Sequence, residues 1–266
     1  MIRLAVRVAR EHAEIVVAEL LVLSPSGLEE RDVDEGTVEL AVYGAPGELP
    51  DVGEVRAAAG GALVEVSTTE LPDDWHERWR EWHRPIDVGP VRVRPPWAEP
   101  RAGALDVAID PGQAFGTGAH ASTRLALELL VDLPAAGALA DWGCGSGVLA
   151  IAGARLGFAP VLACDVEPES VAATVAAAEA NGVGLEVSRC DLRRAAGPWA
   201  PTVTANLVLP LLLDLARVID RPPERLIASG LLSPEVDEIT AAFARHGLEP
   251  RARRDADGWS AILLAR

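Results

Sequence analysis

The sequence contains no lysine, and all 24 of its basic side chains are arginines. This absence excludes enzymes that use a lysine as a nucleophile or to form a Schiff base. Acidic side chains number 40, so the formal net charge is −16 at pH 7. Proteins that hold nucleic acid through its phosphates usually carry a basic face. We therefore expect an acidic surface, a neutral or basic partner, and no direct binding to nucleic acid.

Cysteine is scarce, and long apolar runs are missing. The three cysteines, Cys144, Cys164 and Cys190, lack the spacing of metal ligands and do not suggest a disulfide framework. They fall at or near the ends of predicted strands, so we expect small buried side chains and no metal site. The apolar stretch Ile15–Leu23 is too short to span a membrane, and no signal peptide precedes the first strand. We expect a cytoplasmic monomer without a membrane partner.

Residues 1–70 predict a small α+β domain. Apolar spacing and turn residues indicate elements in the order β-α-β-β-α-β, which is typical of a ferredoxin-like domain. The expected strands cover residues 2–8, 27–33, 37–43 and 62–68, and the expected helices cover residues 11–22 and 51–59.

Residues 71–103 are rich in tryptophan and proline and predict a linker. Trp75, Trp79 and Trp82 recur at i, i+4 and i+7, so they share one face of a helix. Such a stripe would dock the helix on a neighbouring domain, or it would bind a partner directly. The proline-rich remainder predicts an extended connector with one strand, Val91–Arg94.

Residues 104–266 alternate regularly between strands and helices. The expected strands cover residues 105–110, 138–143, 160–165, 185–189, 201–206, 225–230, 248–254 and 259–265, with helices at 122–131, 147–156, 168–181, 209–219 and 234–246. This alternation predicts a parallel, doubly wound α/β sheet. Only a short turn, Asp255–Gly258, separates the last two strands, so they must pair antiparallel. A Rossmann-like sheet that ends in such a hairpin is typical of class I methyltransferases.

A glycine-rich loop follows the second of these strands. The run DWGCGSGVLAI (Asp141–Ile151) passes through Gly143 and Gly145 and then enters a helix. Glycines let a ligand approach the backbone, beside the free N–H groups of the helix start. The spacing is G-x-G-x-G, whereas nicotinamide and flavin sites show G-x-G-x-x-G. Because S-adenosylmethionine has no pyrophosphate, this spacing favours that cofactor, with a plain structural turn as the alternative.

Carboxylates at the next two strand ends complete this pattern. Asp165 ends a strand about 20 residues after the first glycine, where a carboxylate can accept hydrogen bonds from both ribose hydroxyls. A helix N-cap is the alternative role for Asp165. Asp191 follows the next strand and would contact the adenine amino group or serve as a turn residue.

Two further segments supply polar groups for the same crevice. In the run PGQAFGTGAHASTR, residues 111–124, Phe115 would cover the cofactor and Thr123 would donate a hydroxyl hydrogen bond. His120 is a candidate general base or positioning group, although a lone loop histidine is more often structural. Asn206 ends a later strand above the switch point of the sheet, where it would bind substrate or cofactor, or cap the next helix.

Together these motifs resemble those of the bacterial ribosomal protein L11 methyltransferases. The matching segments are GTGAHAST at 116–123, DWGCGSGVLAI at 141–151, DVEP at 165–168, ANL at 205–207, SGLL at 229–232, and a late tryptophan, Trp259. The tryptophan-rich segment and PPW near residue 97 also look like the linker of that family. Ala119 and Ser122 depart from the polar or threonine residues that are often present in the first segment.

The resemblance implies a cofactor, a site and a substrate. Thr123, Gly143, Asp165 and Asn206 match the S-adenosylmethionine contacts of the family. The N-terminal domain would recognise ribosomal protein L11, and the linker would let the domains reorient. The reaction would methylate lysine side chains and the α-amino group of that protein.

Two other functions are open at this point. One is a class I methyltransferase that acts on another protein, an RNA or a small molecule. The acidic charge weighs against RNA, and glutamine-methylating enzymes usually show NPPY where this chain has ANLV, residues 205–208. The other is a non-catalytic module that only binds S-adenosylmethionine. Intact loops around the expected methyl position weigh against it.

Overall fold

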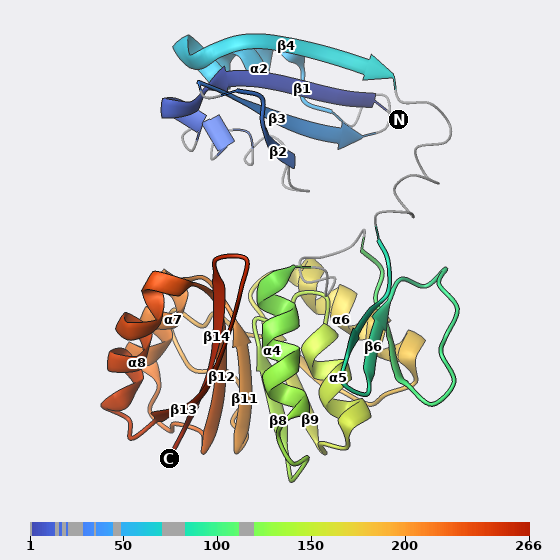
Figure 1. Ribbon diagram of the computed structural model, residues 1–266, viewed down its shortest axis with the longest axis vertical. Coiled ribbons are helices and arrows are strands. Elements are labelled where there is room, and N and C mark those ends of the chain that lie inside the picture. The colour runs from blue at the N-terminus through green and yellow to red at the C-terminus, as the bar shows by residue number, and fades with distance from the viewer. Residues whose placement is uncertain are drawn as a thin grey trace. The chain divides into compact units, whose positions relative to one another are not determined.

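The computed structural model describes residues 2–13, 16–17, 20, 29–34, 36–44, 49–70, 83–111 and 120–266. The chain divides into two compact units, residues 1–82 and 83–266 (Figure 1). The second unit thus includes residues 83–103, which the sequence assigns to a linker. Among the described helices, none is long and apolar enough to cross a membrane.

The first unit is built on a four-stranded antiparallel sheet. Its strand order is β2-β3-β1-β4, with bounds β1 Ile2–Ala9, β2 Glu29–Asp32, β3 Thr37–Gly44 and β4 Leu63–Glu70. One helix, α2 (Val52–Ala59), and two short 3-10 helices, Arg10–His12 and Gly60–Ala62, accompany the sheet. Alternate residues of β1 and β3, such as Leu4, Val6 and Leu40, belong to one apolar core, as does Val55 of α2. This alternation gives the sheet one apolar face, and α2 contributes to the core.

The strands predicted for the first unit are therefore present, within a few residues of the expected bounds. The helix predicted over 11–22 falls partly outside the described residues, so the ferredoxin-like class stays a prediction. Trp75, Trp79 and Trp82 also lie outside the described residues, and the stripe that they were expected to form stays a prediction as well.

The second unit is centred on a seven-stranded sheet with the order β10-β9-β8-β11-β12-β14-β13. The first five strands in this order are parallel, and β14 pairs antiparallel with both β12 and β13. The strand bounds are β8 Leu139–Trp142, β9 Val161–Asp165, β10 Glu186–Arg189, β11 Thr202–Asn206, β12 Arg225–Leu232, β13 Glu249–Ala256 and β14 Trp259–Ala265. The predicted doubly wound sheet with an antiparallel C-terminal hairpin is confirmed.

Helices cover both faces of this sheet, as Figure 1 shows. Their bounds are α4 Ala121–Val131, α5 Val148–Leu156, α6 Pro168–Asn181, α7 Leu209–Val218 and α8 Val236–Ala244, the last preceded by a 3-10 helix, Ser233–Glu235. Buried leucines of α4 and α5 belong to one apolar core, whereas those of α7 and Phe243 of α8 belong to a second. Each face of the sheet therefore has its own core, as expected for a sheet with helices on both sides.

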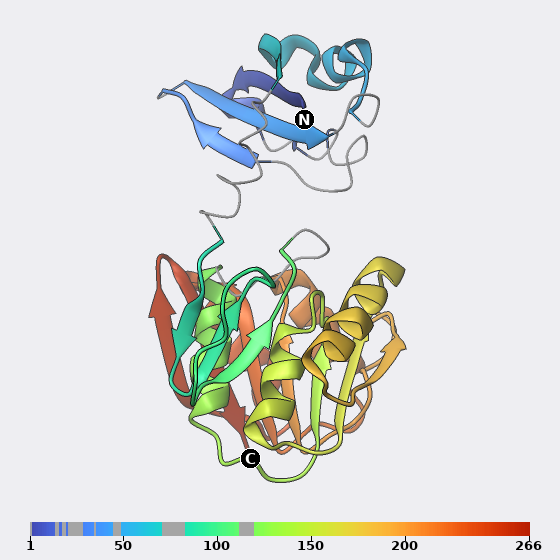
Figure 2. The ribbon, with the colours of Figure 1, turned by 90° about the vertical axis from the view of Figure 1, so that its right-hand side faces the viewer.

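A second, three-stranded sheet differs from the predicted connector. It contains β5 (Ile86–Val88), β6 (Val91–Arg94) and β7 (Leu105–Ala108), with β5 and β6 antiparallel and β6 and β7 parallel. Of these strands, β5 was not predicted, and β7 joins β6 rather than the large sheet. The reason is burial: Val91 and Val107 lie in the same core as α4 and α5, so the small sheet packs against these helices (Figure 2).

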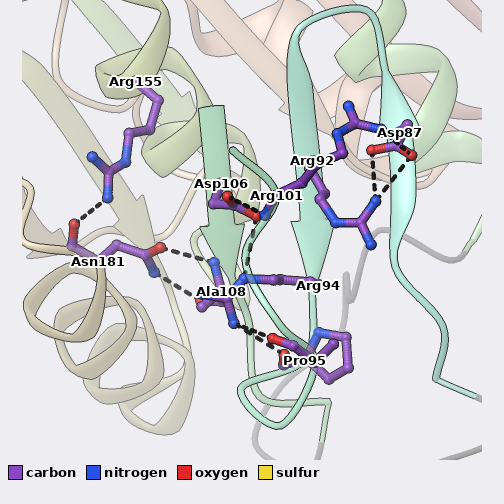
Figure 3. Close-up of polar contacts among 10 residues, drawn as sticks. Asp87, Arg92, Arg94, Pro95, Arg101, Asp106, Ala108, Arg155 and Asn181 are labelled. Atoms are coloured by element: carbon purple, nitrogen blue, oxygen red, sulfur yellow. Dashed lines mark hydrogen bonds and ion pairs between the residues drawn. The ribbon is translucent and has the colours of Figure 1, made fainter. Parts of the chain in front are cut away.

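The outer edge of β7 is closed by the side chain of one residue, Asn181, at the end of α6 (Figure 3). Its Nδ2 donates to the Ala108 carbonyl over 2.7 Å, and its Oδ1 accepts from the Ala108 amide over 2.8 Å. The side-chain amide thus replaces the backbone of a neighbouring strand. Asn181 is nearly buried, and Arg155 donates to its carbonyl over 2.6 Å, which fixes α6 beside α5.

Replacing Asn181 with alanine should lower the free energy of unfolding by about 2 kcal/mol. The reason is that the amide and the carbonyl of Ala108 both lose their hydrogen bonds to the Asn181 side chain. Urea denaturation followed by circular dichroism measures this change. The control is Glu179→Ala, an exposed position on the same helix, which should stay within about 0.5 kcal/mol of the parent. Equal midpoints for the parent and Asn181→Ala would contradict the assigned role of Asn181.

Candidate functional site

A cavity of about 380 Å³ lies at the carboxyl ends of β8, β9 and β11. The chain passes from β8 to β9 on one side, and β11 flanks β8 on the other, so the strand order reverses here. Ligands of open α/β sheets bind at such switch points. Five predicted cofactor residues line this cavity: Thr123, Gly143, Gly145, Asp165 and Asn206. The structure thus brings together residues that are spread over more than 80 positions of the sequence.

The glycine-rich loop forms one wall of the cavity. Gly143 has a φ of +77°, and a Cβ at this position would lie 2.3 Å from a methyl carbon of Leu207. Gly147 has a φ of +80° and faces Thr174 in the same way, at 3.0 Å. The amides of Gly143 and Cys144 both donate to the Cys164 carbonyl, over 2.8 and 3.0 Å. The positive φ at both positions, together with the contact at Thr174, therefore favours glycine at 143 and 147, in addition to any need for close ligand approach.

Asp165 lies at the end of β9 and faces this loop. Its carboxylate accepts from the Gly145 amide over 3.0 Å and from the Glu167 amide over 3.1 Å. The N-cap of α6 is Glu167, so the alternative role predicted for Asp165 is wrong. Asp191 also lines the cavity, and it accepts from the Arg193 amide over 3.1 Å, as a turn residue does. Both carboxylates line the cavity, and their contacts with a ribose and an adenine stay predictions.

Asn206 and Thr123 meet on the other side of the loop. The Asn206 amide donates to the Thr123 hydroxyl over 3.1 Å. The N-cap of α7 is Val208, so Asn206 does not cap that helix, and the alternative role for Asn206 is also wrong. Thr123 is fully buried in the first turn of α4, while Asn206 is half-buried. This hydrogen bond connects α4 to the end of β11 at the edge of the cavity.

His120 is the N-cap of α4. Its Nδ1 accepts from the Ser122 amide over 3.3 Å and lies 2.8 Å from the Ser122 hydroxyl. The imidazole packs edge-on against the ring of Trp259, with centroids 4.7 Å apart. Burial lowers the pKa of His120 below its ordinary value, so the ring is neutral at pH 7. His120 thus has a structural role, and a catalytic role for it stays a prediction. Phe115 lies outside the described residues, and so does its predicted contact with the cofactor.

Comparisons with known proteins identify the family of this chain. A family model described as Ribosomal protein L11 methyltransferase (PrmA) matches residues 26–266. The chain belongs to this family. The ribosomal protein L11 methyltransferase of Symbiobacterium thermophilum is 38% identical over 221 residues, which cover 80% of this chain and 73% of that protein. Its counterpart from Methylococcus capsulatus is 36% identical over 242 residues, covering 85% and 81%.

A solved structure agrees with this assignment. The crystal structure of the ribosomal protein L11 methylase from Lactobacillus delbrueckii subsp. bulgaricus superposes with a TM-score of 0.61 at 27% identity. It covers 69% of this chain and 99% of that one. The resemblance deduced from the motifs is confirmed, and the chain is a methyltransferase.

The first acid of the glycine-rich motif, Asp141, has a role in the methyltransferase that sequence reasoning missed. Asp141 is buried beneath the loop, accepts from the Thr204 hydroxyl over 2.8 Å and accepts from the Ala150 amide over 3.2 Å. Ala150 is in the first turn of α5, whose N-cap, Gly147, has no side chain to cap it. Asp141 therefore caps the start of α5, although it precedes Ala150 by nine residues in the sequence. Its place two residues before the first glycine is the only sequence signal for this role.

The three cysteines of the methyltransferase are free thiols. Cys144 and Cys164 are buried, as predicted, and Cys190 is half-buried. Burial raises the pKa of the Cys144 thiol to about 12, although the Thr174 hydroxyl donates to its sulfur over 3.2 Å. Cys144 therefore stays protonated at the edge of the switch-point cavity. Within the described residues, no group of three histidine, cysteine or acidic side chains is arranged to hold a metal ion.

Replacing Asp165 with alanine should weaken the binding of S-adenosylhomocysteine roughly a hundredfold, because a charged acceptor for two ribose hydroxyls is lost. Isothermal titration calorimetry measures the dissociation constant. Glu167→Ala is the matched control, since Glu167 is an exposed acid two residues away, and it should bind like the parent. An unchanged affinity of Asp165→Ala would refute the ribose assignment.

Asp141 should make the stability of the methyltransferase depend on pH. Burial raises its pKa from the ordinary 3.8 to about 7, so the folded chain keeps a proton that the unfolded chain has released. The stabilisation that comes from this retained proton is fully present below pH 3.8 and is lost as the pH rises through 7. The loss is roughly 1.4 kcal/mol per unit of pKa difference.

Urea denaturation at several pH values tests this effect. The variant Asp141→Asn does not ionise and can still accept from the Ala150 amide. Its free energy of unfolding should therefore fall less than that of the parent as the pH rises from about 5 to about 8. Parallel pH profiles for the two proteins would show that Asp141 does not titrate in this range.

Proposed function

We propose that this chain transfers methyl groups from S-adenosylmethionine to lysine side chains and the N-terminal α-amine of ribosomal protein L11. The observation that carries the proposal is the family match over residues 26–266, which spans the whole second unit and much of the first. The geometry of the switch-point cavity supports it. The acidic charge of the chain also suits a basic protein partner.

The residues around the cavity fit the chemical parts of S-adenosylmethionine. The volume of the cavity, about 380 Å³, lies in the range of small-molecule sites. Asp165 offers a carboxylate for the ribose hydroxyls, and Asp191 lies further along the same edge of the sheet for the adenine amino group. Gly143, Thr123 and Asn206 would hold the methionine part on the other side of the loop.

The reaction is a direct methyl transfer. When bound, S-adenosylmethionine supplies a methyl group on a positively charged sulfur, which is already a strong electrophile. The lone pair of the amine nitrogen forms the new N–C bond, while the S–C electron pair stays on sulfur and gives S-adenosylhomocysteine. The amine proton leaves to solvent. The protein must mainly hold the amine in line at attack distance and exclude water.

The amine must be neutral before it attacks, and a lysine has an ordinary pKa of about 10.4. Leu207, Val208 and Leu211 line the cavity next to Asn206 and make this part of the site apolar. An apolar surrounding disfavours the charged ammonium form, and the Asn206 carbonyl would accept a hydrogen bond from the incoming amine. The proposed mechanism therefore requires no dedicated general base.

We also propose separate roles for the two units. The first unit would recognise the ribosomal protein, since it has its own sheet and its own core. Residues 83–103 belong to the second unit, so a linker that lets the units reorient would lie before residue 83. Such a hinge would let several amines of one substrate reach one site.

Incubation with labelled S-adenosylmethionine and a mixture of ribosomal proteins tests the function. We expect label in ribosomal protein L11, on lysines and the N-terminal amine, as located by mass spectrometry. Asn206→Ala should lower the rate about a hundredfold, because the cofactor and the amine are no longer held in line.

Two results would overturn the proposed function, and a third would change the assignment of the site. Label in RNA or in another protein would reassign the substrate. Tight cofactor binding without transfer to any component would indicate a binding module. A parent-like rate for Asn206→Ala would remove Asn206 from the site.

A further inference from the structure

A β-bulge interrupts β12 beside the cofactor site. Ala228 pairs with Ile262 of β14, whereas Leu231 pairs with Ser260, so three steps along β12 match two along β14. The extra residue falls at Ser229–Gly230. Gly230 has a φ of +82°, and a Cβ there would lie 2.6 Å from the Leu207 carbonyl oxygen. Bulges of this kind redirect a side chain and are common next to active sites.

The redirected side chain is that of Ser229, which contacts α4. Its hydroxyl donates to the Ser122 carbonyl over 2.8 Å, and both residues are buried. The Ser229 carbonyl accepts from the Leu207 amide over 2.9 Å. One buried residue thus holds the first turn of α4 with its side chain and the end of β11 with its backbone.

These two anchor points are the direct sequence neighbours of cofactor-site residues. Ser122 precedes Thr123, and Leu207 follows Asn206. The bond between the Asn206 amide and the Thr123 hydroxyl therefore lies between the two segments that Ser229 connects. The Ser122 hydroxyl in turn lies 2.8 Å from His120 Nδ1. Any shift of α4 relative to β11 would change all of these contacts together.

The bond from Ser229 is not needed to satisfy the backbone of α4. At the start of a helix the amides lack partners, whereas the carbonyls already accept from amides four residues ahead. Ser122 O is such a carbonyl, in the first turn. Its additional bond from Ser229 fixes the position of the helix rather than completing its hydrogen bonding.

We infer that Ser229 is a positioning residue of the cofactor site, which acts by holding Thr123 and Asn206 in register. This inference rests on the proposed function, because it assigns the methionine part of the cofactor to these two side chains. It predicts that loss of the Ser229 hydroxyl weakens cofactor binding only through Thr123 and Asn206.

Calorimetry with S-adenosylhomocysteine tests the inference on four full-length variants. Ser229→Ala should bind about tenfold more weakly than the parent, and Thr123→Val should also bind more weakly. The double variant should show little loss beyond the larger single effect, because both changes break one arrangement. Thr202→Val is the control: its buried hydroxyl in β11 has no hydrogen-bond partner among the described residues, so its loss should leave affinity unchanged.

Two results would overturn the inference: parent-like binding by Ser229→Ala, or losses that simply add in the double variant. If Ser229→Ala does not fold, Ser229→Cys replaces it, because the slightly larger thiol leaves no cavity and is a weaker donor. It should then bind several-fold more weakly, again without adding to Thr123→Val. A parent enzyme that binds S-adenosylhomocysteine but methylates no ribosomal protein would overturn the proposed function and leave these affinities interpretable.

Discussion

The hydrogen bond between Asn206 and Thr123 joins two segments that are 83 residues apart in the sequence, and the proposed cofactor site depends on it. It fixes the start of α4 to the end of β11 on one side of the glycine-rich loop. On the other side of the loop, the Asp165 carboxylate accepts a hydrogen bond from the Gly145 amide. The loop itself contains three glycines with positive φ, which no bulky residue adopts without strain. Hydrogen bonds and backbone conformation within the protein therefore define the geometry around this loop, and efficient transfer between two substrates requires such defined geometry.

Buried polar groups beneath this site position the surrounding helices and strands rather than act in the reaction. Asp141 caps α5 from below, Thr174 donates to the Gly145 carbonyl over 2.9 Å, and Ser229 holds α4. Each of them is buried and hydrogen-bonded, so removing one leaves a desolvated polar group without its partner or weakens the contact between two elements. Their common feature is a short side chain that bonds to the backbone of another element. Together they keep the loop, α4, α5 and the strand ends in one arrangement.

Much of the second unit was predictable because its signals are local. Strand and helix periodicity located nearly every element from β8 to β14, and the short turn at Asp255–Gly258 required the antiparallel hairpin. Asp165 and Asn206 were found because strand ends of a parallel sheet meet at one edge. The roles that depend on distant contacts were not visible. Nothing near Asp141 in the sequence points to Ala150, and the bulge at Ser229 arises only when β12 pairs with β14. The three-residue strand β5 was missed because it is short and depends on pairing with β6 and on the burial of Val88 in the core.

The most direct measurement of the central claim is a crystal structure of the chain with bound S-adenosylhomocysteine. We predict ribose hydroxyls on the Asp165 carboxylate and the homocysteine part beside Thr123 and Asn206, with the sulfur open toward Leu207. A second cavity of about 380 Å³ lies between β7 and α6, lined in part by Arg94 and Asp110. Density for the ligand in that cavity, with the switch-point cavity empty, would contradict the account.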